Sequence, residues 1–332
     1  MIISRAPTRI TLGGGGTDLA SFYSRHGGFL VAGAIDKYVF VSVNKRFYES
    51  IRLSYSKTEI VGKASDLKHT RVREALKSLG TNGGIEIVSI ADVPANCGLG
   101  SSSSFMVALL NALHAYKREF VSLDQLAEEA CQIEIGVLQE PIGKQDQYIS
   151  AFGGLTCLTF DRNGDVLVEP LRMPNELLYQ LESSILLFYT GIERSASEIL
   201  SEQDAKTKKG DSQVMDNLLQ IKEIGLESRK VLEKGDLDAF GDLLDVHWNV
   251  KRRISGSISS SFIDECYEVA RKNGALGGKI MGAGGGGFFM FYCNGNGAKV
   301  RLTDALKKCG LKPMYFRFDF EGVKVLVNMR KV

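Results

Sequence analysis

Three clusters of glycine and serine constrain this chain more than any other feature of its sequence. The clusters are Gly13–Gly16, the PANCGLGSSSS segment of Pro94–Ser104, and the GAGGGG segment of Gly282–Gly287. Glycine adopts backbone conformations that other residues avoid, and it lets a ligand approach the main chain closely. Each cluster therefore predicts either a tight turn or a ligand contact, and for the first cluster taken alone both alternatives stay open.

The second cluster predicts an anion-binding helix start. It runs directly into an apolar stretch, which favours a helix from about residue 103 to residue 116. The first N–H groups of a helix have no partner within it, and the helix dipole is positive at that end. Small residues let an anion reach those groups. A helix cap needs one serine, so the run of serines with two glycines favours an anion site over a simple cap.

The third cluster contains GxGxxG, the pattern of dinucleotide-binding loops. Such a loop must leave a strand and open a helix, whereas these glycines lead into FFMFY, which is typical of a strand. A nucleotide-binding P-loop is also excluded, because Gly143-Lys144 is followed by glutamine instead of serine or threonine. The sequence thus predicts phosphate-binding loops in a protein that is neither a Rossmann nor a P-loop protein.

Glu134 and Asp146 occupy positions where an apolar residue is expected. Glu134 lies four residues after Ala130, on the apolar stripe of the predicted second helix, and Asp146 lies four residues after Ile142. A charged group on a buried face is costly unless it is paired or bound to a metal. An edge position or a structural salt bridge is the alternative for each. Together they predict one carboxylate that binds Mg²⁺ and one that orients or deprotonates a hydroxyl group.

The composition excludes several classes of protein. Apolar residues are 44% and charged residues 24% of the 332 residues, which is typical of a globular protein, and at ~150 residues per domain the length predicts two domains. A net charge of +2 predicts neither nucleic acid nor a membrane as partner, and no apolar run reaches the ~18–20 residues of a membrane helix. The opening MIISRAPTRI shows no secretory signal, and the scattered cysteines indicate reduced thiols, so we expect a cytoplasmic location.

Helix and strand patterns alternate irregularly, which favours an α+β fold over a doubly wound parallel sheet. Strands are predicted at residues 39–43, 51–55, 85–90, 185–189 and 288–292, with hairpins around Asn163-Gly164 and Glu321-Gly322. Helices are predicted at residues 103–116, from Ser122 to before Pro141, and at 211–233, 238–253 and 261–273. The segment around Pro170–Pro174 predicts a boundary between domains of residues 1–176 and 177–332.

With these motifs in place, the sequence resembles the GHMP kinases, the family of galactokinase, homoserine kinase and mevalonate kinase. APTRITLGGGGTD is similar to the first motif of the family, PANCGLGSSSS to the second, and KIMGAGGGG to the third. The resemblance covers nearly the whole chain. It implies a two-domain GHMP-kinase-like fold with the nucleotide in the cleft between the domains, ATP and Mg²⁺ as cofactors, and transfer of the γ-phosphate of ATP to a hydroxyl group.

The resemblance also implies roles for individual residues. The residues expected to bind ATP are Pro94, Asn96, Gly98, Leu99, Gly100, Ser101, Ser102 and Ser103. Ser102 and Glu134 are expected to bind Mg²⁺, and Asp146 and Arg9 are the expected catalytic residues. The expected substrate-binding residues are Gly15, Gly16, Thr17, Asp18, Gly284 and Gly285. Gly15-Gly16 stands where galactokinase has Glu-His, which argues against galactose as the substrate.

LGGGGTDL, IGKQDQYISAFGGL and YTGIERSASEI are similar to the branch of the family that phosphorylates D-glycero-D-manno-heptose 7-phosphate. This implies transfer to the anomeric hydroxyl, with a product used for nucleotide-activated heptose and surface glycans. The substrate's own phosphate requires a cation, for which Arg194 is the first candidate and Lys251 the second. Another sugar, a mevalonate-type substrate, or a non-catalytic sugar sensor are the alternatives. The expected partners are a small-molecule sugar phosphate and ATP, with a homodimer as the assembly considered.

Overall fold

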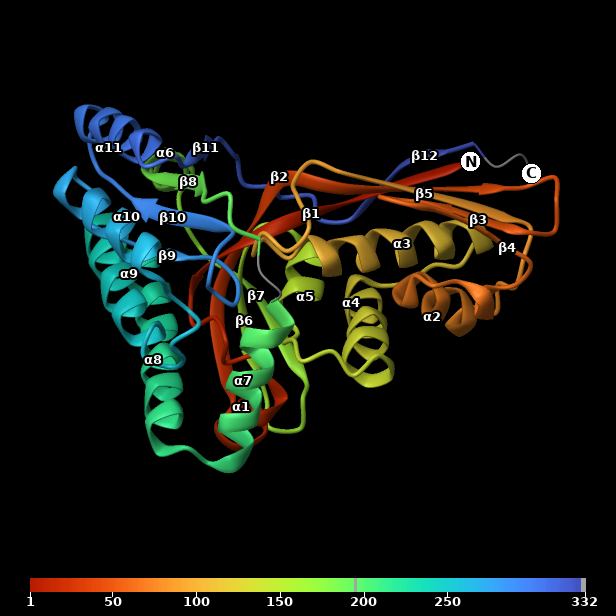
Figure 1. Ribbon diagram of the computed structural model, residues 1–332, viewed down its shortest axis with the longest axis horizontal. Coiled ribbons are helices and arrows are strands. Elements are labelled where there is room, and N and C mark those ends of the chain that lie inside the picture. The colour runs from red at the N-terminus through yellow and green to blue at the C-terminus, as the bar shows by residue number, and fades with distance from the viewer. Residues whose placement is uncertain (194–195, 330–332) are drawn as a thin grey trace.

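Two β-sheets organise the chain (Figure 1). The computed structural model describes residues 1–193 and 196–329. The larger sheet consists of β1 (Ile2–Gly13), β2 (Gly28–Lys45), β3 (Ile51–Ser54), β4 (Thr58–Val61), β5 (Ile85–Ala91), β6 (Leu155–Phe160), β7 (Val166–Pro170) and β12 (Lys324–Asn328). The smaller sheet has the order β11-β8-β10-β9, and its strands are β8 (Ile185–Tyr189), β9 (Gly277–Ile280), β10 (Phe288–Tyr292) and β11 (Lys312–Met314).

The long antiparallel pair of β1 and β2 forms the centre of the larger sheet. β2 changes partner along its length, because Gly28–Gly33 pairs with β6 and Val39–Lys45 pairs with β5. In β1 the first residues alternate between buried and half-buried, and the later ones are all buried, as in a strand that is covered on both faces. This covered part ends at Gly13, so the sheet carries the first glycine cluster into the interior of the molecule.

Helix α3 (Ser101–Lys117) is the central helix of the first half of the chain (Figure 1). Every residue from Ser103 to Leu110 is buried, so the helix needs cover on all sides. It packs on β1 and β2 and is covered by its neighbours. The other elements of this half are α1 (Ala20–His26), η1 (Ala64–Asp66), α2 (Thr70–Ser78), α4 (Leu123–Cys131), η2 (Gln132–Val137) and α5 (Gln145–Phe152). The start of α3, where the second cluster lies, is thereby fixed in place.

Several helices accompany the smaller sheet in the second half of the chain. They are α6 (Asn175–Ser184), α7 (Ala196–Lys209), α8 (Ser212–Lys234), α9 (Leu237–Lys251), α10 (Ser261–Lys272) and α11 (Asn296–Lys308). Trp248 of α9 and Phe289 of β10 are fully buried, with their ring centroids 6.2 Å apart. Helix α8 also packs on β1 and β2, and a Cβ on Gly225 would lie 2.9 Å from the Cα atom of Gly14. The second half of the chain therefore braces the first glycine cluster directly.

Most predicted elements are confirmed. β8 and β10 have the predicted bounds, the hairpin of β6 and β7 is present, and α8, α9 and α10 lie within a few residues of prediction. The helix predicted from Ser122 begins at Leu123, with the Ser122 side chain as its cap, and it changes into the π-helical turn η2 before Pro141. Turns of this kind occur frequently at functional sites.

The hairpin predicted around Glu321-Gly322 is wrong. β12 pairs with β1 of the larger sheet, and the segment before it makes only an isolated bridge between Phe318 and Ile35. A hairpin pattern shows that two segments are extended, but it does not show that they pair with each other. The predicted domain boundary after residue 176 lies inside α6, just before the smaller sheet begins, and stays a prediction; the return of β12 to β1 crosses it.

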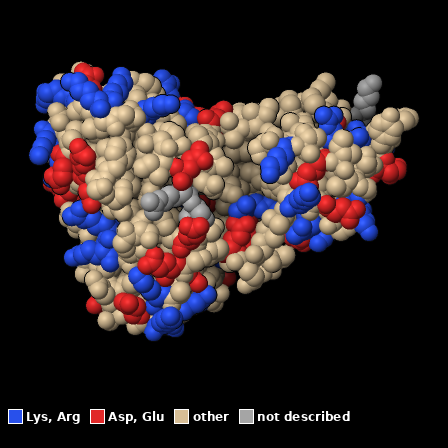
Figure 2. Space-filling view, in the orientation of Figure 1, with Lys and Arg blue, Asp and Glu red and all other residues tan. Residues whose placement is uncertain are grey.

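Lys and Arg are interspersed with Asp and Glu over the face shown in Figure 2, in keeping with the small net charge. Of the cysteines, five are buried and Cys309 is half-buried, and all six are free thiols. In the part of the chain that the structure describes, no helix combines the length and the apolar character needed to cross a membrane.

Candidate active site

A cavity of about 380 Å³ lies where the three glycine clusters meet. Its walls come from the end of β1, the start of α3, the first turn of α5 and the last turn of α9. The structure brings most of the predicted site residues together on these walls. They are Arg9, Gly15, Gly16, Asp18, Asn96, Gly98, Gly100, Ser101, Ser102, Ser103 and Asp146.

The first cluster turns the chain sharply and directs Asp18 at the cavity. Gly14 has a φ of +81°, and a Cβ there would lie 2.1 Å from the carbonyl oxygen of Phe29, so only glycine fits. The Thr17 hydroxyl lies 2.8 Å from the Gly14 carbonyl oxygen and 2.9 Å from that of Phe29. Thr17 is fully buried and does not line the cavity; it holds the loop against β2.

The second cluster brings the main chain close to two other parts of the site. Gly98 and Gly100 have φ values of +83° and +77°. A Cβ on Gly98 would lie 2.6 Å from the Met281 carbonyl oxygen, and one on Gly100 would lie 3.0 Å from the Asp146 carboxylate. α3 begins at Ser101, so the N–H groups of its first turn lie at the cavity wall without partners inside the helix. These features fit a phosphate-binding loop.

The third cluster interlocks with the second through main-chain contacts. The Phe288 N–H donates to the Cys97 carbonyl oxygen at 3.1 Å, and a Cβ on Gly282 would lie 2.7 Å from the Cα atom of Gly98. Gly282 lines the cavity, whereas Gly284 and Gly285 do not. The Gly285 N–H donates to the Ile258 carbonyl oxygen at 2.8 Å, so this part of the cluster braces the loop.

Asp146 is held beside the second cluster by Arg9. The Arg9 Nε–H donates to Asp146 Oδ1 at 2.7 Å, and its Nη1 donates to the Gly98 carbonyl oxygen at 2.5 Å. The Arg9 side chain is only 5% exposed, so a single orientation links the carboxylate to the loop. The main-chain N–H of Arg9 donates to the Leu99 carbonyl oxygen at 2.9 Å, while the Leu99 side chain is buried in the core and does not line the cavity.

Asp18 places a second carboxylate on the same wall. Gln145 donates to Asp18 Oδ2 from its side-chain amide at 3.0 Å and from its main-chain N–H at 3.2 Å, and the Gly16 N–H donates to Oδ1 at 3.1 Å. Burial raises the pKa of Asp18, and the charge of nearby Asp146 raises it further. A Cβ on Gly143 would lie 1.9 Å from Asp18 Oδ2, so the absence of a side chain there makes room for the carboxylate.

Glu134, on η2, lies one layer behind the cavity wall and is fully buried. Its carboxylate accepts hydrogen bonds from Arg71 Nε at 2.9 Å, from Gln147 Nε2 at 2.6 Å and from the Ser103 hydroxyl. Burial raises the pKa of Glu134, and the Arg71 charge opposes that rise. The salt bridge that the sequence left open is therefore present, and Ser103 is the serine that bonds Glu134, while Ser102 is exposed on the cavity wall.

The Glu134 carboxylate and the Ser103 hydroxyl supply oxygens of the kind that bind a hard cation, although Arg71 and Gln147 occupy the carboxylate in this structure. Carboxylate and hydroxyl oxygens are the ligands that Mg²⁺ prefers, and it usually keeps several waters beside one or two protein ligands. Among residues 1–193 and 196–329, no group of three or more His, Cys, Asp or Glu side chains could hold a metal. A metal here would thus need additional oxygen ligands from water or from a bound substrate.

Two predicted residues, Pro94 and Arg194, remain to be considered. Pro94 is exposed and does not line the cavity. Arg194 falls outside the described residues, so the structure gives it no position. Both remain predictions.

Sequence reasoning missed three residues of the cavity wall. Gln145 links Asp18 to β1, because it also accepts a hydrogen bond from Thr11 Oγ1 at 2.6 Å. Arg71 lies on α2 and meets Glu134 through tertiary contacts, without a local signal. Lys279 carried a signal that was not used, since a charged residue directly before the apolar Ile280-Met281 pair is unusual in a buried strand.

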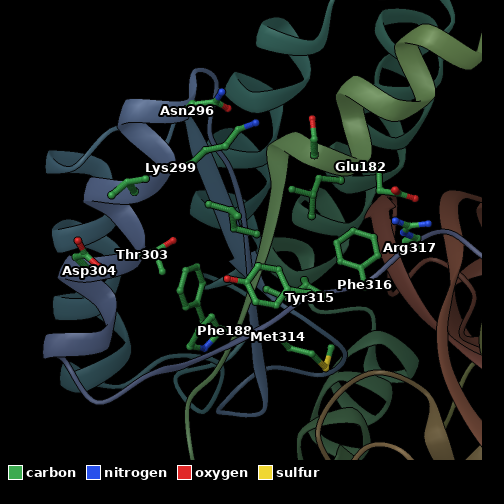
Figure 3. Close-up of a pocket in the computed structure, with 16 residues that line it drawn as sticks. Glu182, Phe188, Asn296, Lys299, Thr303, Asp304, Met314, Tyr315, Phe316 and Arg317 are labelled. Atoms are coloured by element: carbon green, nitrogen blue, oxygen red, sulfur yellow. The ribbon is translucent and has the colours of Figure 1, made fainter.

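A second cavity of about 630 Å³ lies between β8, α11 and the segment that follows β11 (Figure 3). Figure 3 shows the rings of Tyr315 and Phe316 beside it, with Lys299 on α11 and Arg317 beyond the aromatic pair. None of the three glycine clusters reaches this cavity. We therefore take the smaller cavity as the candidate active site.

Two family models match parts of this chain. The model "GHMP kinases N terminal domain" matches residues 67–154, and the model "GHMP kinases C terminal" matches residues 228–311. A D-glycero-alpha-D-manno-heptose 7-phosphate kinase of Campylobacter jejuni is 29% identical over 344 residues, which cover 97% of this chain and 98% of the relative. An L-fucokinase/L-fucose-1-P guanylyltransferase of Bacteroides fragilis is 26% identical, covering 94% of this chain and 37% of its own length.

Solved structures share the fold over the full length. The crystal structure of a D-glycero-D-manno-heptose 1-phosphate kinase from Bacteroides thetaiotaomicron superposes with a TM-score of 0.81 at 24% identity. The match covers 99% of this chain and 100% of that one.

Proposed function

Because the chain belongs to the GHMP kinases, and as such is an ATP-dependent kinase, we propose that its acceptor is the anomeric hydroxyl of D-glycero-D-manno-heptose 7-phosphate. The product would supply nucleotide-activated heptose for surface glycans. The observation that carries the proposal is the placement of Asp146, Arg9 and Asp18 on one cavity wall beside the phosphate-binding loop. The heptose 7-phosphate kinase relative, which matches along the whole chain, supports the choice of sugar phosphate.

Asp146 and Arg9 divide the work of phosphoryl transfer. Catalysis of this reaction depends mainly on positioning and on stabilising the charge that develops on the transferred group. Asp146 accepts the hydrogen bond of the attacking hydroxyl, orients its oxygen and takes the proton as the new bond forms. Arg9 lies between Asp146 and the Gly98 carbonyl, where its charge stabilises the phosphoryl oxygens. The N–H groups at the start of α3 bind the phosphates of ATP.

Asp18 and Gln145 bind the sugar in this proposal. The Asp18 carboxylate lies on the wall between Gly16 and Gln145, and its remaining acceptor capacity faces the cavity that would hold the sugar hydroxyls. Gly15 and Gly16 let the main chain approach the sugar, where a larger pair of residues would take up space. Arg194 stays the first candidate from the sequence for binding the substrate's phosphate.

Mg²⁺ fits the oxygens of Glu134 and of the serines at the start of α3, with Ser102 as the proposed ligand on the cavity wall. When bound, the ion would neutralise phosphate charge. Glu134→Gln keeps the shape of the side chain and removes its charge. We expect this variant to need a higher Mg²⁺ concentration for half-maximal rate, with the KM for the sugar phosphate little changed. Superimposable Mg²⁺ titrations of variant and parent would exclude Glu134 as a metal ligand.

The proposed substrate is tested by measuring ADP release from ATP across a panel of sugars and sugar phosphates. The panel includes heptose 7-phosphate, heptose 1-phosphate, unphosphorylated heptose, galactose, fucose and mevalonate, and phosphorus NMR of the product identifies the phosphorylated position. We expect the highest kcat/KM for heptose 7-phosphate, with a phosphate signal on the anomeric oxygen. A higher kcat/KM for an unphosphorylated sugar would rule out the heptose phosphate while leaving the kinase assignment intact.

A further inference from the structure

Two lysines share one wall of the active-site cavity without a carboxylate partner. Lys251 ends α9 and Lys279 lies in β9, and both line the cavity that contains Arg9. Lys279 is only 2% exposed. Among residues 1–193 and 196–329, no carboxylate forms a salt bridge with either ammonium group, whereas Arg9 already pairs with Asp146. The wall thus carries two amino groups that have no carboxylate partner in the described chain.

Burying such a charge is costly, and the surroundings of the two lysines show this cost. Burial, together with repulsion from Arg9, lowers the pKa of Lys251 to about 7. Burial lowers the pKa of Lys279 well below its ordinary value, and the neighbouring Lys251 and Arg9 lower it further. Behind them, both ring nitrogens of the fully buried His247 lack a partner in the described residues. Burying these groups without partners lowers the stability of the fold, and a bound anion would offset that cost.

The two lysines differ in their protein contacts. Lys251 Nζ donates to the carbonyl oxygens of Ile280 at 3.3 Å and Gly282 at 2.5 Å, so it also holds the start of the third glycine cluster. The Lys279 side chain makes no hydrogen bond or salt bridge in the part of the chain that the structure describes, although it lies on the cavity wall. A purely structural role can explain Lys251, but it does not explain Lys279.

The position of the pair indicates what kind of anion it binds. Gly282, which Lys251 contacts, packs against Gly98, and Gly98 in turn accepts a hydrogen bond from Arg9. The lysines are therefore next to the point where Arg9 and Asp146 meet. Three cationic groups around one point suit a group with two negative charges and several acceptor oxygens, which is the chemistry of a phosphoryl group.

We propose that Lys251 and Lys279, with Arg9, form a subsite for a phosphoryl dianion on the wall of the cavity. The inference rests on the proposed function of the cavity. The dianion has two sources, the terminal phosphoryl group of the nucleotide or the phosphate of the sugar substrate. Because a lysine ammonium acts as a point charge without fixed geometry, the pair can neutralise such a group without fixing its orientation.

The test compares Lys251→Met and Lys279→Met with the matched control Lys222→Met. Lys222 also donates to a main-chain carbonyl, that of His26 at 2.7 Å, but it does not line the cavity. Isothermal titration gives the Kd of each protein for inorganic phosphate, for ADP and for a non-hydrolysable ATP analogue. Steady-state kinetics give kcat and the KM values of the parent's best substrate. Lys279→Arg, which keeps the charge, tests for rescue.

We expect both methionine variants to bind inorganic phosphate about 10–100-fold more weakly than the parent, with the control unchanged. If the nucleotide supplies the dianion, the variants lose preference for the ATP analogue over ADP, and kcat falls. If the sugar phosphate supplies it, that preference stays and the KM for the sugar phosphate rises by a similar factor. Lys279→Arg should recover most of the loss in either case.

Thermal unfolding serves as the control that the variants are correctly folded. Removing an unpaired buried charge should leave the Tm of Lys279→Met equal to or above that of the parent, whereas a structural lysine would lower it. If Lys279→Met does not fold, Lys279→Gln takes its place. Folded variants with unchanged phosphate affinity, nucleotide preference, kcat and sugar-phosphate KM would overturn the subsite. Because phosphate binding does not depend on turnover, a parent that lacks sugar-phosphate kinase activity would overturn the proposed substrate without removing this readout.

Discussion

At the scale of single residues, the site depends on how one arginine divides its hydrogen bonds. Arg9 donates to Asp146 and to the main chain of Gly98, so the reacting carboxylate and the phosphate-binding loop share one anchor. Such an arrangement keeps reacting groups in position before substrate arrives, which is worth more in a buried site than in water. The carboxylate of Asp146 is therefore part of the loop's support, and in the proposed function it also accepts a hydrogen bond from the substrate.

Asp146→Asn tests the first of these roles. The variant keeps the size of the side chain and a carbonyl oxygen for Arg9, but it loses the charge that accepts the hydroxyl proton. We expect kcat to fall by roughly 10²–10⁴, the usual range for a group that transfers a proton in the transition state. Steady-state kinetics with saturating ATP and sugar phosphate measure this. A kcat near that of the parent would remove Asp146 from the reaction.

Gly143→Ala tests the position of Asp18. The new Cβ would lie 1.9 Å from Asp18 Oδ2, so the carboxylate must move, while the ATP-binding loops are untouched. We expect the KM for the sugar substrate to rise by about 10-fold or more, as for the loss of one charged hydrogen bond, with the KM for ATP nearly constant. The matched control is Gly256→Ala, where a Cβ would meet nothing within 4 Å. Equal KM values for the two variants would separate Asp18 from sugar binding.

At the scale of elements, the second and third glycine clusters act as one unit. Their main chains touch at Gly98 and Gly282, and a hydrogen bond from Phe288 to Cys97 joins the same two loops. No side chain separates them, so the two loops cannot move independently without losing these contacts. The phosphate-binding loop at the start of α3 is consequently supported by the strands of the smaller sheet.

Gly98→Ala tests this coupling. A Cβ there would lie 2.6 Å from the Met281 carbonyl oxygen, and the φ of +83° is strained for alanine. We expect weaker ATP binding by calorimetry and a Tm lowered by several degrees, as for a loss of about 1–3 kcal/mol. Gly210→Ala has a similar φ of +73° but open space around its Cβ, so it separates backbone strain from displacement of the loop. Identical ATP affinity in the two variants would argue that the loops are not coupled.

At the scale of the whole molecule, the cavity needs both halves of the chain. Arg9, Asp18 and Asp146 come from the half that carries the larger sheet, whereas Lys251 and Lys279 come from the half that carries the smaller one. Helix α8 joins the halves by packing on β1 and β2. The two lysines and the carboxylates therefore line one cavity only in the complete fold.

The charge on Lys251 also predicts how stability changes with pH. Burial and Arg9 lower its pKa from 10.5 to about 7, while the unfolded chain keeps the ordinary value. Between pH 7 and pH 10.5 the Lys251 amine is protonated in the unfolded chain but neutral in the folded protein. The loss of stability caused by burying Lys251 therefore decreases as the pH rises through this range. The pKa values of the neighbouring Lys279 and His247 are also lowered, so each of them likewise reduces the stability of the fold less as the pH rises.

We expect Lys251→Met to be more stable than the parent near neutral pH, with the difference shrinking as the pH approaches 10. Urea unfolding at several pH values measures the free energy of unfolding of both proteins. Titration of groups that do not interact with Lys251 is common to parent and variant and cancels in the difference, whereas the pKa values of Lys279 and His247, which Lys251 lowers, rise in the variant. A constant difference between Lys251→Met and the parent would mean that Lys251 titrates normally in the folded protein.

The sequence by itself determined the features that depend on neighbours along the chain. The α+β class, the three glycine clusters and the Ser122 cap follow from local patterns. Glu134 and Asp146 were detectable because a charge on an apolar stripe is locally anomalous. These patterns involve residues close together in the sequence, so they can be recognised without knowledge of the fold.

The tertiary structure alone decided which of these residues meet. The return of β12 to β1, the pairing of Glu134 with Arg71 and the support of Asp18 by Gln145 join residues far apart in the chain. The sequence drew attention to Lys251 and carried a signal at Lys279, but it could not show that the two lysines lie on one cavity wall without a carboxylate partner in the described chain. Whether a side chain is buried, and whether an opposite charge lies beside it, depends on how the two halves of the chain pack together.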